Sequence, residues 1–228
     1  MVFDCEKQMA EPAEEWLRSR GMMTKREFTL PWGILDLVGC SLNQRHVMKR
    51  VALGQTRPIG PHERIMILAQ IPDVTEGTAV TKQKLTRIFR GLYDERGIAA
   101  ELSRLMAGKF VSRTRQDGFQ RVNGWMPLQR RIIALELKLA RVSDAVAQAV
   151  RHLSFADESY VGLPIDTAYH VLRSRQRLTF DENGIGLIAV CRDGCRVLLK
   201  SRPAGSELDP LLQAHCVERF WRDRLRGS

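Results

Sequence analysis

The spacing of apolar residues changes early in the chain, from a helical period to short continuous runs. An apolar stripe with helical spacing predicts a helix over residues 7–20, with Pro12 in its first turn and Gly21 at its end. The apolar stretches 25–30 and 34–42 follow, separated by a proline and a glycine. They predict two paired strands.

The middle segment returns to helical spacing. Residues 61–70, 81–90 and 94–107 each carry an apolar stripe typical of a helix, and Thr81 is a suitable N-cap for the second. Residues 109–115 and 119–122 then flank an Asp-Gly pair, which is a strong hairpin signal. Three helices followed by a hairpin resemble a winged helix-turn-helix.

Strands and helices alternate in the last hundred residues. We expect strands at 132–139 and 159–163, helices at 143–155 and 166–176, a hairpin over 185–200 and a last helix at 208–225. Ser143 is the predicted N-cap of the first of these helices. A strand, helix, strand succession implies a right-handed crossover and a parallel pair, so the fold class is α/β.

The net charge of +10 is concentrated in the middle of the chain. Residues 43–130 hold 16 Lys and Arg against 7 Asp and Glu, a balance of +9, which leaves +1 for the other 140 residues. A basic module beside a nearly neutral one is expected of a nucleic-acid-binding protein. A solvated basic face without a partner is the equally weighted alternative.

Composition excludes several classes of protein. No apolar run approaches the ~20 residues that a membrane helix needs, and the N-terminus lacks the apolar region of a signal peptide. We therefore expect no membrane partner and a cytoplasmic location. The 5 cysteines show no paired CxxC spacing, so thiols are favoured over a zinc site.

Three charged residues stand on otherwise apolar strands. Asp36 lies in the second predicted strand, and Glu136 and Lys138 lie in the third. Because alternate side chains of a strand share a face, Glu136 and Lys138 point the same way. Two carboxylates and a lysine make a plausible site for a divalent metal and an attacking water. The alternative is that charges on an exposed edge strand only solvate it.

The order helix, strand, strand, strand, helix, strand, with Asp36 and then Glu-x-Lys, resembles the PD-(D/E)XK nuclease superfamily over about residues 1–42 and 128–200. Gln148, in Gln-Ala-Val-Arg-His152, resembles a common fourth motif of that superfamily. The chain departs from the pattern because Leu35, not proline, precedes Asp36. The resemblance implies a restriction-endonuclease-like mixed sheet flanked by helices, with an inserted winged-helix domain. The expected domains are 1–44 and 128–228 for the nuclease-like core and 45–127 for the insertion.

The resemblance also implies a site. Asp36 and Glu136, with the Leu137 carbonyl as a third ligand, would hold Mg²⁺ or Mn²⁺, both of which prefer oxygen ligands. Lys138 would orient the water or offset charge in the transition state, and Gln148 would position Lys138 or a water. The first helix of this superfamily often supplies a glutamate. Glu6 continues the apolar stripe of that helix, while Glu27 on the first strand is the alternative.

DNA contacts are expected from the basic insertion. Candidate residues on the third helix and the hairpin are Arg96, Arg104, Lys109, Arg113, Arg115 and Arg121. Many winged helices bind proteins instead, and that alternative stays open.

The prediction is a metal-dependent DNA endonuclease that acts on double-stranded DNA, as a homodimer if two active sites are needed. One alternative is a non-catalytic DNA-binding regulator or assembly module with an inactive nuclease-like core. Another is an RNA-processing nuclease.

Overall fold

The computed structural model describes residues 3–30, 33–122, 126–205 and 208–224, without the side chains of 222–224. The chain forms two compact units. The core unit comprises Met1–Ser41 and Gln129–Asp209, and the insertion unit comprises Leu42–Leu128 and Pro210–Ser228. No helix in the described ranges is long and apolar enough to cross a membrane.

The core unit is α/β, as predicted, and is built on a six-stranded mixed sheet. The strand order is β1-β2-β6-β7-β8-β9, in which β1 with β2 and β8 with β9 are antiparallel, while β6 with β7 and β7 with β8 are parallel. The strands are β1 (Met23–Leu30), β2 (Gly33–Leu42), β6 (Gln129–Leu137), β7 (Glu158–Pro164), β8 (Gly186–Cys191) and β9 (Gly194–Leu199).

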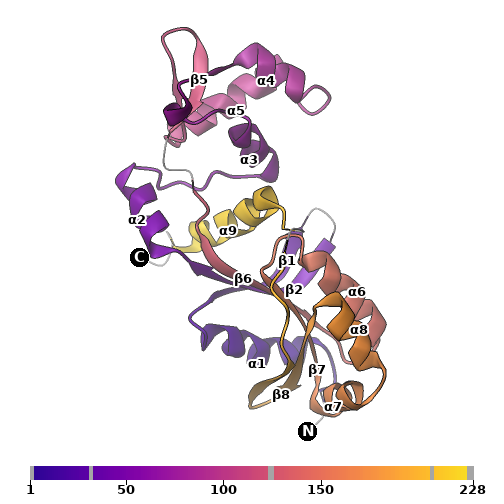
Figure 1. Cartoon of the computed structure of the whole chain (residues 1–228). Helices are drawn as coiled ribbons and strands as arrows, with labels where there is room; N and C mark the ends of the chain where they lie inside the picture. Colours follow the sequence, from indigo (N-terminus) through magenta and orange to yellow (C-terminus); the bar gives the residue numbers. More distant parts are fainter. Residues whose placement is uncertain (1–2, 31–32, 123–125, 206–207, 225–228) are drawn as a thin grey trace. The chain divides into compact units, whose positions relative to one another are not determined.

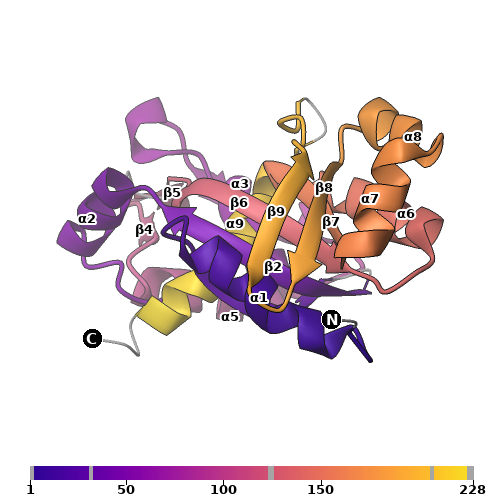
Figure 2. The ribbon, with the colours of Figure 1, turned by 90° about the horizontal axis from the view of Figure 1, so that it is seen from below.

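Helices cover both faces of this sheet (Figures 1 and 2). One apolar cluster joins α1 (Lys7–Arg18) to inward side chains of β2, β6 and β8. A second cluster joins α6 (Val142–His152), α7 (Ile165–Arg173) and α8 (Gln176–Asn183) to β7 and β8. The sheet therefore has an α1 face and an α6 face.

The first helix is held by its apolar stripe and by one buried carboxylate. Met9, Ala13 and Leu17 are fully buried, as the periodicity predicts. Glu14 is also buried, and it accepts hydrogen bonds from Thr24 Oγ1 at 2.6 Å and from the Arg26 guanidinium at 2.7 Å. These bonds tie α1 to β1, so α1 has a fixed position over the sheet.

The connections between parallel strands differ in detail from the prediction. The N-cap of α6 is Arg141, in a left-handed conformation with φ of 54°, and Ser143 lies inside the helix, so the Ser143 prediction is wrong. The helix α8 was not predicted, because its sequence lacks a strong apolar stripe. Gly162 lies where a Cβ would come 2.6 Å from Leu137 Cδ2, so glycine permits the close approach of β7 to β6.

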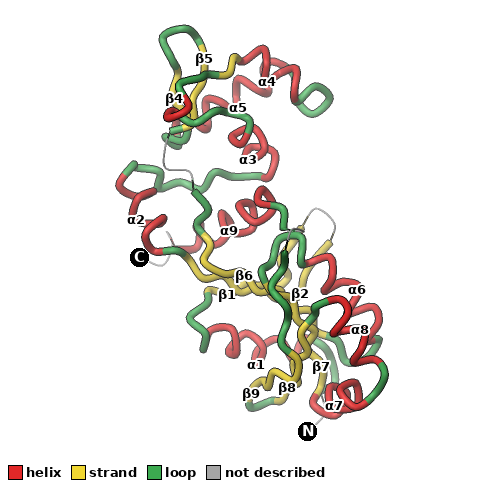
Figure 3. Tube along the Cα trace, in the orientation of Figure 1, coloured by secondary structure: helices red, strands yellow, loops and turns green. Residues whose placement is uncertain are grey.

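The insertion unit holds short helices and a small sheet (Figure 3). The three-stranded sheet has the order β3-β5-β4, with antiparallel pairs. The Thr81 side chain caps α4 by accepting a hydrogen bond from the Lys84 N–H, and the Asp94 side chain caps α5 by accepting one from the Gly97 N–H. The elements are α2 (Gln44–Ala52), α3 (His62–Ala69), the 3₁₀ helix η1 (Val74–Glu76), β3 (Val80–Thr81), α4 (Lys82–Ile88), α5 (Glu95–Ala107), β4 (Val111–Arg113), β5 (Gly118–Arg121) and α9 (Pro210–Arg224).

The C-terminal helix α9 belongs to the insertion unit, which corrects the predicted 128–228 segment of the core. Glu218 of α9 is buried and pairs with the buried Arg50 of α2, with Arg50 Nη2 3.0 Å from Glu218 Oε2. The Ile59 N–H donates to the same carboxylate at 2.7 Å, and Trp221 Nε1 donates to the Thr56 carbonyl at 2.9 Å. The position of α9 in the sequence suggested that it belongs to the core unit, but these long-range hydrogen bonds join it to the insertion unit.

Candidate functional site

Three carboxylates converge on one lysine in the core unit. Lys138 Nζ lies 2.7 Å from Glu136 Oε1, 3.6 Å from Glu6 Oε2 and 3.7 Å from Asp36 Oδ2. These four residues, which we call the carboxylate cluster, come from the start of α1, from β2 and from the end of β6. The structure thus brings together four of the five side chains predicted to be catalytic.

Backbone hydrogen bonds fix two of the carboxylates. The Leu137 N–H donates to Asp36 Oδ2 at 2.8 Å, and the Leu139 N–H donates to Glu6 Oε1 at 3.4 Å. Glu6 occupies the N-cap position of α1, but its side chain does not cap that helix. The Glu6 carboxylate is therefore available to reach across to β6. Leu137 enters the cluster through its amide N–H, and its predicted role as a metal ligand through the carbonyl stays a prediction.

Strand alternation explains why Glu136 points away from α1, toward the α6 face. Leu135 and Leu137 are buried in the apolar cluster under α1, so Glu136 points to the opposite face. The side chains are 2% exposed for Glu136, 13% for Lys138, 35% for Asp36 and 43% for Glu6. Glu136 therefore lies at the buried end of the cluster, and Asp36 and Glu6 lie at its solvent-exposed end.

Burial and like charges perturb the two inner groups. Burial raises the pKa of Glu136 well above the ordinary carboxyl value, and the neighbouring charges of Asp36 and Glu6 raise it further. Burial alone would lower the pKa of Lys138, but the hydrogen bond to Glu136 and the three negative charges raise it above its ordinary value. Lys138 therefore stays charged at neutral pH, while Glu136 is poised to take up or release a proton.

Gln148 lies on α6 but does not enter the cluster through a hydrogen bond. Its Oε1 is buried and has no hydrogen-bond partner among the described residues. Gln148 and His152 line a small pocket of about 80 Å³ together with Leu30, Gly33, Ile34, Leu35 and Arg151. The predicted positioning of Lys138 by Gln148 stays a prediction.

His152 is a buried residue that sequence reasoning did not select. It is 5% exposed, and its Nδ1 has no hydrogen-bond partner within the described part of the chain. Burial lowers the pKa of His152 to about 4, so the imidazole is neutral at neutral pH. The available signal was its position four residues after Gln148, on the same side of α6.

The choice between the two candidate glutamates favours Glu6. Glu27 is exposed on β1, adopts a left-handed φ of 47°, and makes no ion pair with Lys138. Glu6 makes that ion pair and accepts a hydrogen bond from the backbone N–H of Leu139, just after β6.

The oxygen-rich donor set fits the chemistry of Mg²⁺ or Mn²⁺. Glu136 Oε2 is buried without a hydrogen-bond partner among the described residues, so it retains an oxygen able to accept a cation. In the same described ranges, however, no three His, Cys, Asp or Glu side chains are grouped around a point that could hold a metal ion. The carboxylates are arranged instead around the Lys138 ammonium.

The predicted DNA-binding residues of the insertion unit fall into two groups. Three are paired within the unit: Arg104 with Glu101, Arg113 with Asp117, and Arg121 with Asp73. Arg121 is also only 20% exposed. The other three, Arg96, Lys109 and Arg115, are exposed and make no ion pair within the described residues.

Comparison with known proteins adds little. No protein-family model and no curated protein matches the chain. A solved structure described as the SPO1766 protein of unknown function from Silicibacter pomeroyi aligns with 100% of this chain and 90% of that chain, with 10% identity and a TM-score of 0.47. A likeness of this degree carries no conclusion about function.

Proposed function

We propose that the core unit is a metal-dependent DNA endonuclease of the PD-(D/E)XK type, and that the insertion unit binds the DNA. The observation that carries this proposal is the convergence of Glu6, Asp36 and Glu136 on Lys138 Nζ. About one hundred residues separate Asp36 from Glu136 in the sequence. Burying a carboxylate is costly, so a cluster that holds one inside a sheet suits a functional role.

The finer fold assignments belong to the same proposal. The order α1, β1, β2, β6, α6, β7 and the parallel pairing of β6 with β7 support a restriction-endonuclease-like core. The order α3, β3, α4, α5, β4, β5 supports a winged helix-turn-helix in the insertion unit. In that interpretation α5 is the recognition helix and the β4–β5 hairpin is the wing.

The cluster residues have distinct roles in phosphodiester hydrolysis. Bound at Asp36 and Glu136, with the Leu137 carbonyl, Mg²⁺ or Mn²⁺ would polarise the scissile phosphate and lower the pKa of a water. Lys138 stays protonated beside these carboxylates, and it orients the water or offsets negative charge in the transition state. Glu6 and Asp36 form ion pairs with Lys138 at the solvent-exposed end of the site.

A cleavage assay tests the proposal. Purified protein is incubated with supercoiled plasmid and Mg²⁺ or Mn²⁺, beside the Asp36→Asn and Lys138→Ala variants. We expect nicking or linearisation by the wild type and a loss of about 100-fold or more in both variants. Circular dichroism checks that the variants fold.

The matched control is Glu27→Gln, which removes an exposed carboxylate of the neighbouring strand that lies outside the cluster. This variant should cleave like the wild type. Equal cleavage by the wild type and both cluster variants, or no cleavage of any DNA form, would contradict the nuclease proposal.

One observation favours a second candidate. The Lys138 ammonium itself forms ion pairs with all three carboxylates, and no three-ligand metal group is present among the described residues. A DNA-binding regulator or assembly module with an inactive nuclease-like core would show this arrangement. A gel shift without metal-dependent cleavage would select this second function.

A further inference from the structure

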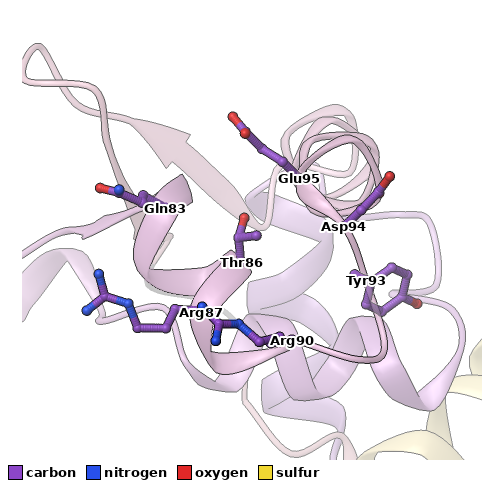
Figure 4. A pocket seen from close by; sticks show the side chains of 7 residues that line it. All are labelled: Gln83, Thr86, Arg87, Arg90, Tyr93, Asp94 and Glu95. Atoms are coloured by element: carbon purple, nitrogen blue, oxygen red, sulfur yellow. The ribbon is translucent and has the colours of Figure 1, made fainter.

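A surface pocket lies beside α4 in the insertion unit, at its turn into α5 (Figure 4). Its volume is about 490 Å³. Seven residues line it: Gln83, Thr86, Arg87, Arg90, Tyr93, Asp94 and Glu95. In Figure 4 both arginine side chains extend from α4 and the turn that follows it, whereas the two acidic side chains extend from the start of α5. The pocket is therefore basic along one wall and acidic along the other.

The acidic wall is already engaged elsewhere. Asp94 caps α5 by accepting a hydrogen bond from the Gly97 N–H at 2.7 Å. Glu95 forms an ion pair with Lys82, with Nζ 2.6 Å from Oε1. Neither carboxylate forms an ion pair with Arg87 or Arg90.

The basic wall has no such partners. Arg87 and Arg90 are exposed, and within the described residues neither makes an ion pair or a side-chain hydrogen bond. Arg87 lies in the last turn of α4 and Arg90 in the turn that follows the helix, and both line the same pocket. Near the C-terminus of α4 they also interact favourably with the helix dipole, but this effect is worth only about 0.3–1 kcal/mol and leaves the guanidinium donors free. The guanidinium groups of Arg87 and Arg90 therefore line the pocket with N–H donors that have no acceptor among the described residues.

This arrangement contrasts with that of three of the six basic residues chosen from the sequence. Arg104, Arg113 and Arg121 each have an internal carboxylate partner, and a phosphate would have to compete with it. Arg87 and Arg90 carry no such competition. The Gln83 amide and the Tyr93 hydroxyl also line the pocket, and such groups commonly hydrogen-bond to phosphate and sugar oxygens, whereas the Thr86 hydroxyl already donates to the Lys82 carbonyl at 3.1 Å.

We propose that Arg87 and Arg90 form a binding site for the phosphate backbone of a nucleic acid. The identity of the ligand as duplex DNA rests on the function proposed above, while the site itself rests on its unpaired guanidinium groups. The site positions the backbone and carries no base specificity. Arg forks bind phosphate oxygens in a bidentate manner, so lysine at these positions would preserve the charge but lose part of the contact.

Counterion release makes the proposal measurable. Each neutralised phosphate contributes about 0.9 to the slope of log affinity against log salt concentration for duplex DNA. Binding is measured on the Asp36→Asn protein without divalent metal, so that cleavage cannot interfere. We expect the Arg87→Ala/Arg90→Ala double variant to lose about 2 from that slope and at least about 10-fold in affinity near physiological salt.

The matched control is Arg177→Ala, because Arg177 of α8 is an exposed arginine that is paired with Asp181 and has no proposed role in DNA binding. It should change the slope by less than about half a unit. The Arg87→Lys/Arg90→Lys variant should keep most of the wild-type slope, which a merely structural role for arginine would not require. Thermal unfolding of each variant monitors folding.

The outcomes separate this proposal from the nuclease proposal. An unchanged slope in the alanine double variant, or no binding of duplex DNA by the parent protein, would overturn the site. Arginine-dependent binding without metal-dependent cleavage by the wild type would support the site and contradict the nuclease. A single-stranded oligonucleotide bound more tightly than the duplex, with the same arginine dependence, would keep the backbone site and change the substrate.

Discussion

Glutamine at position 136 should make the core unit more stable at alkaline pH. In the wild type Glu136 is 2% exposed, and burial first, then the charges of Asp36 and Glu6, raises its pKa from 4.5 to about 7. The native state therefore binds this proton more tightly than the unfolded chain does. The contribution of Glu136 to the free energy of unfolding is therefore fully present below about pH 4.5, and it is lost as the pH rises through about 7.

The size of the effect follows from the same pKa. The rise from 4.5 to about 7 corresponds to roughly 3 kcal/mol, at about 1.4 kcal/mol for each pH unit. Glu136→Gln removes the ionisation and keeps an oxygen that can accept the hydrogen bond from Lys138. The variant should match the wild type near pH 4.5 and exceed its free energy of unfolding by up to about 3 kcal/mol above pH 7.

Urea unfolding without divalent metal measures this difference, with hydrogen exchange of peptides from β6 and β7 reporting on the core unit alone. The variant Glu27→Gln, which removes an exposed carboxylate outside the cluster, serves as the control. The reasoning fails if Glu136→Gln is less stable than the wild type above pH 7, or if the difference is the same at every pH. Under the proposed function the stabilised variant should also have lost DNA cleavage.

Three further predictions concern packing. Glu218→Gln leaves the buried Arg50 without its counter-charge and should destabilise the insertion unit by about 3–5 kcal/mol, measured by urea unfolding with hydrogen exchange of peptides from residues 42–128. Burial raises the pKa of Glu14, but hydrogen bonds and charges from β1 and α1 lower it overall. Glu14→Gln should therefore cost about 1–3 kcal/mol at neutral pH, and the difference from the wild type should shrink as the pH falls through the lowered pKa, which denaturation at a series of pH values checks. Gly162→Ala places a methyl group 2.6 Å from a leucine of β6 and should cost about 1–3 kcal/mol, with a lower Tm in calorimetry; an unchanged Tm would show that the strands can shift freely.

Local patterns predicted much of the secondary structure. The apolar stripes of α1, α3, α4 and α5, the Asp-Gly hairpin and the parallel β6–β7 pair all follow from periodicity and turn chemistry. Two helices were not predicted. The helix α8 carries a weak apolar stripe. In α2 one of the two buried residues is the charged Arg50, whose partner Glu218 lies far away in the sequence.

The candidate site shows the same division. Alternation along β6 predicted that Glu136 and Lys138 share a face, and the structure agrees. The choice of Glu6 over Glu27 was open in the sequence and was decided by the path of the chain before α1. The pairing of Arg121 with Asp73 was equally invisible, because these two residues are far apart in the sequence.

The sequence by itself determined which residues could carry chemistry and which face of each element they occupy, because these depend on local geometry. The tertiary structure alone decided that three carboxylates meet at Lys138 and that α9 joins the insertion unit. It also decided that Arg87 and Arg90 keep their charges unpaired. These outcomes depend on contacts between residues far apart in the chain, and no local pattern encodes them.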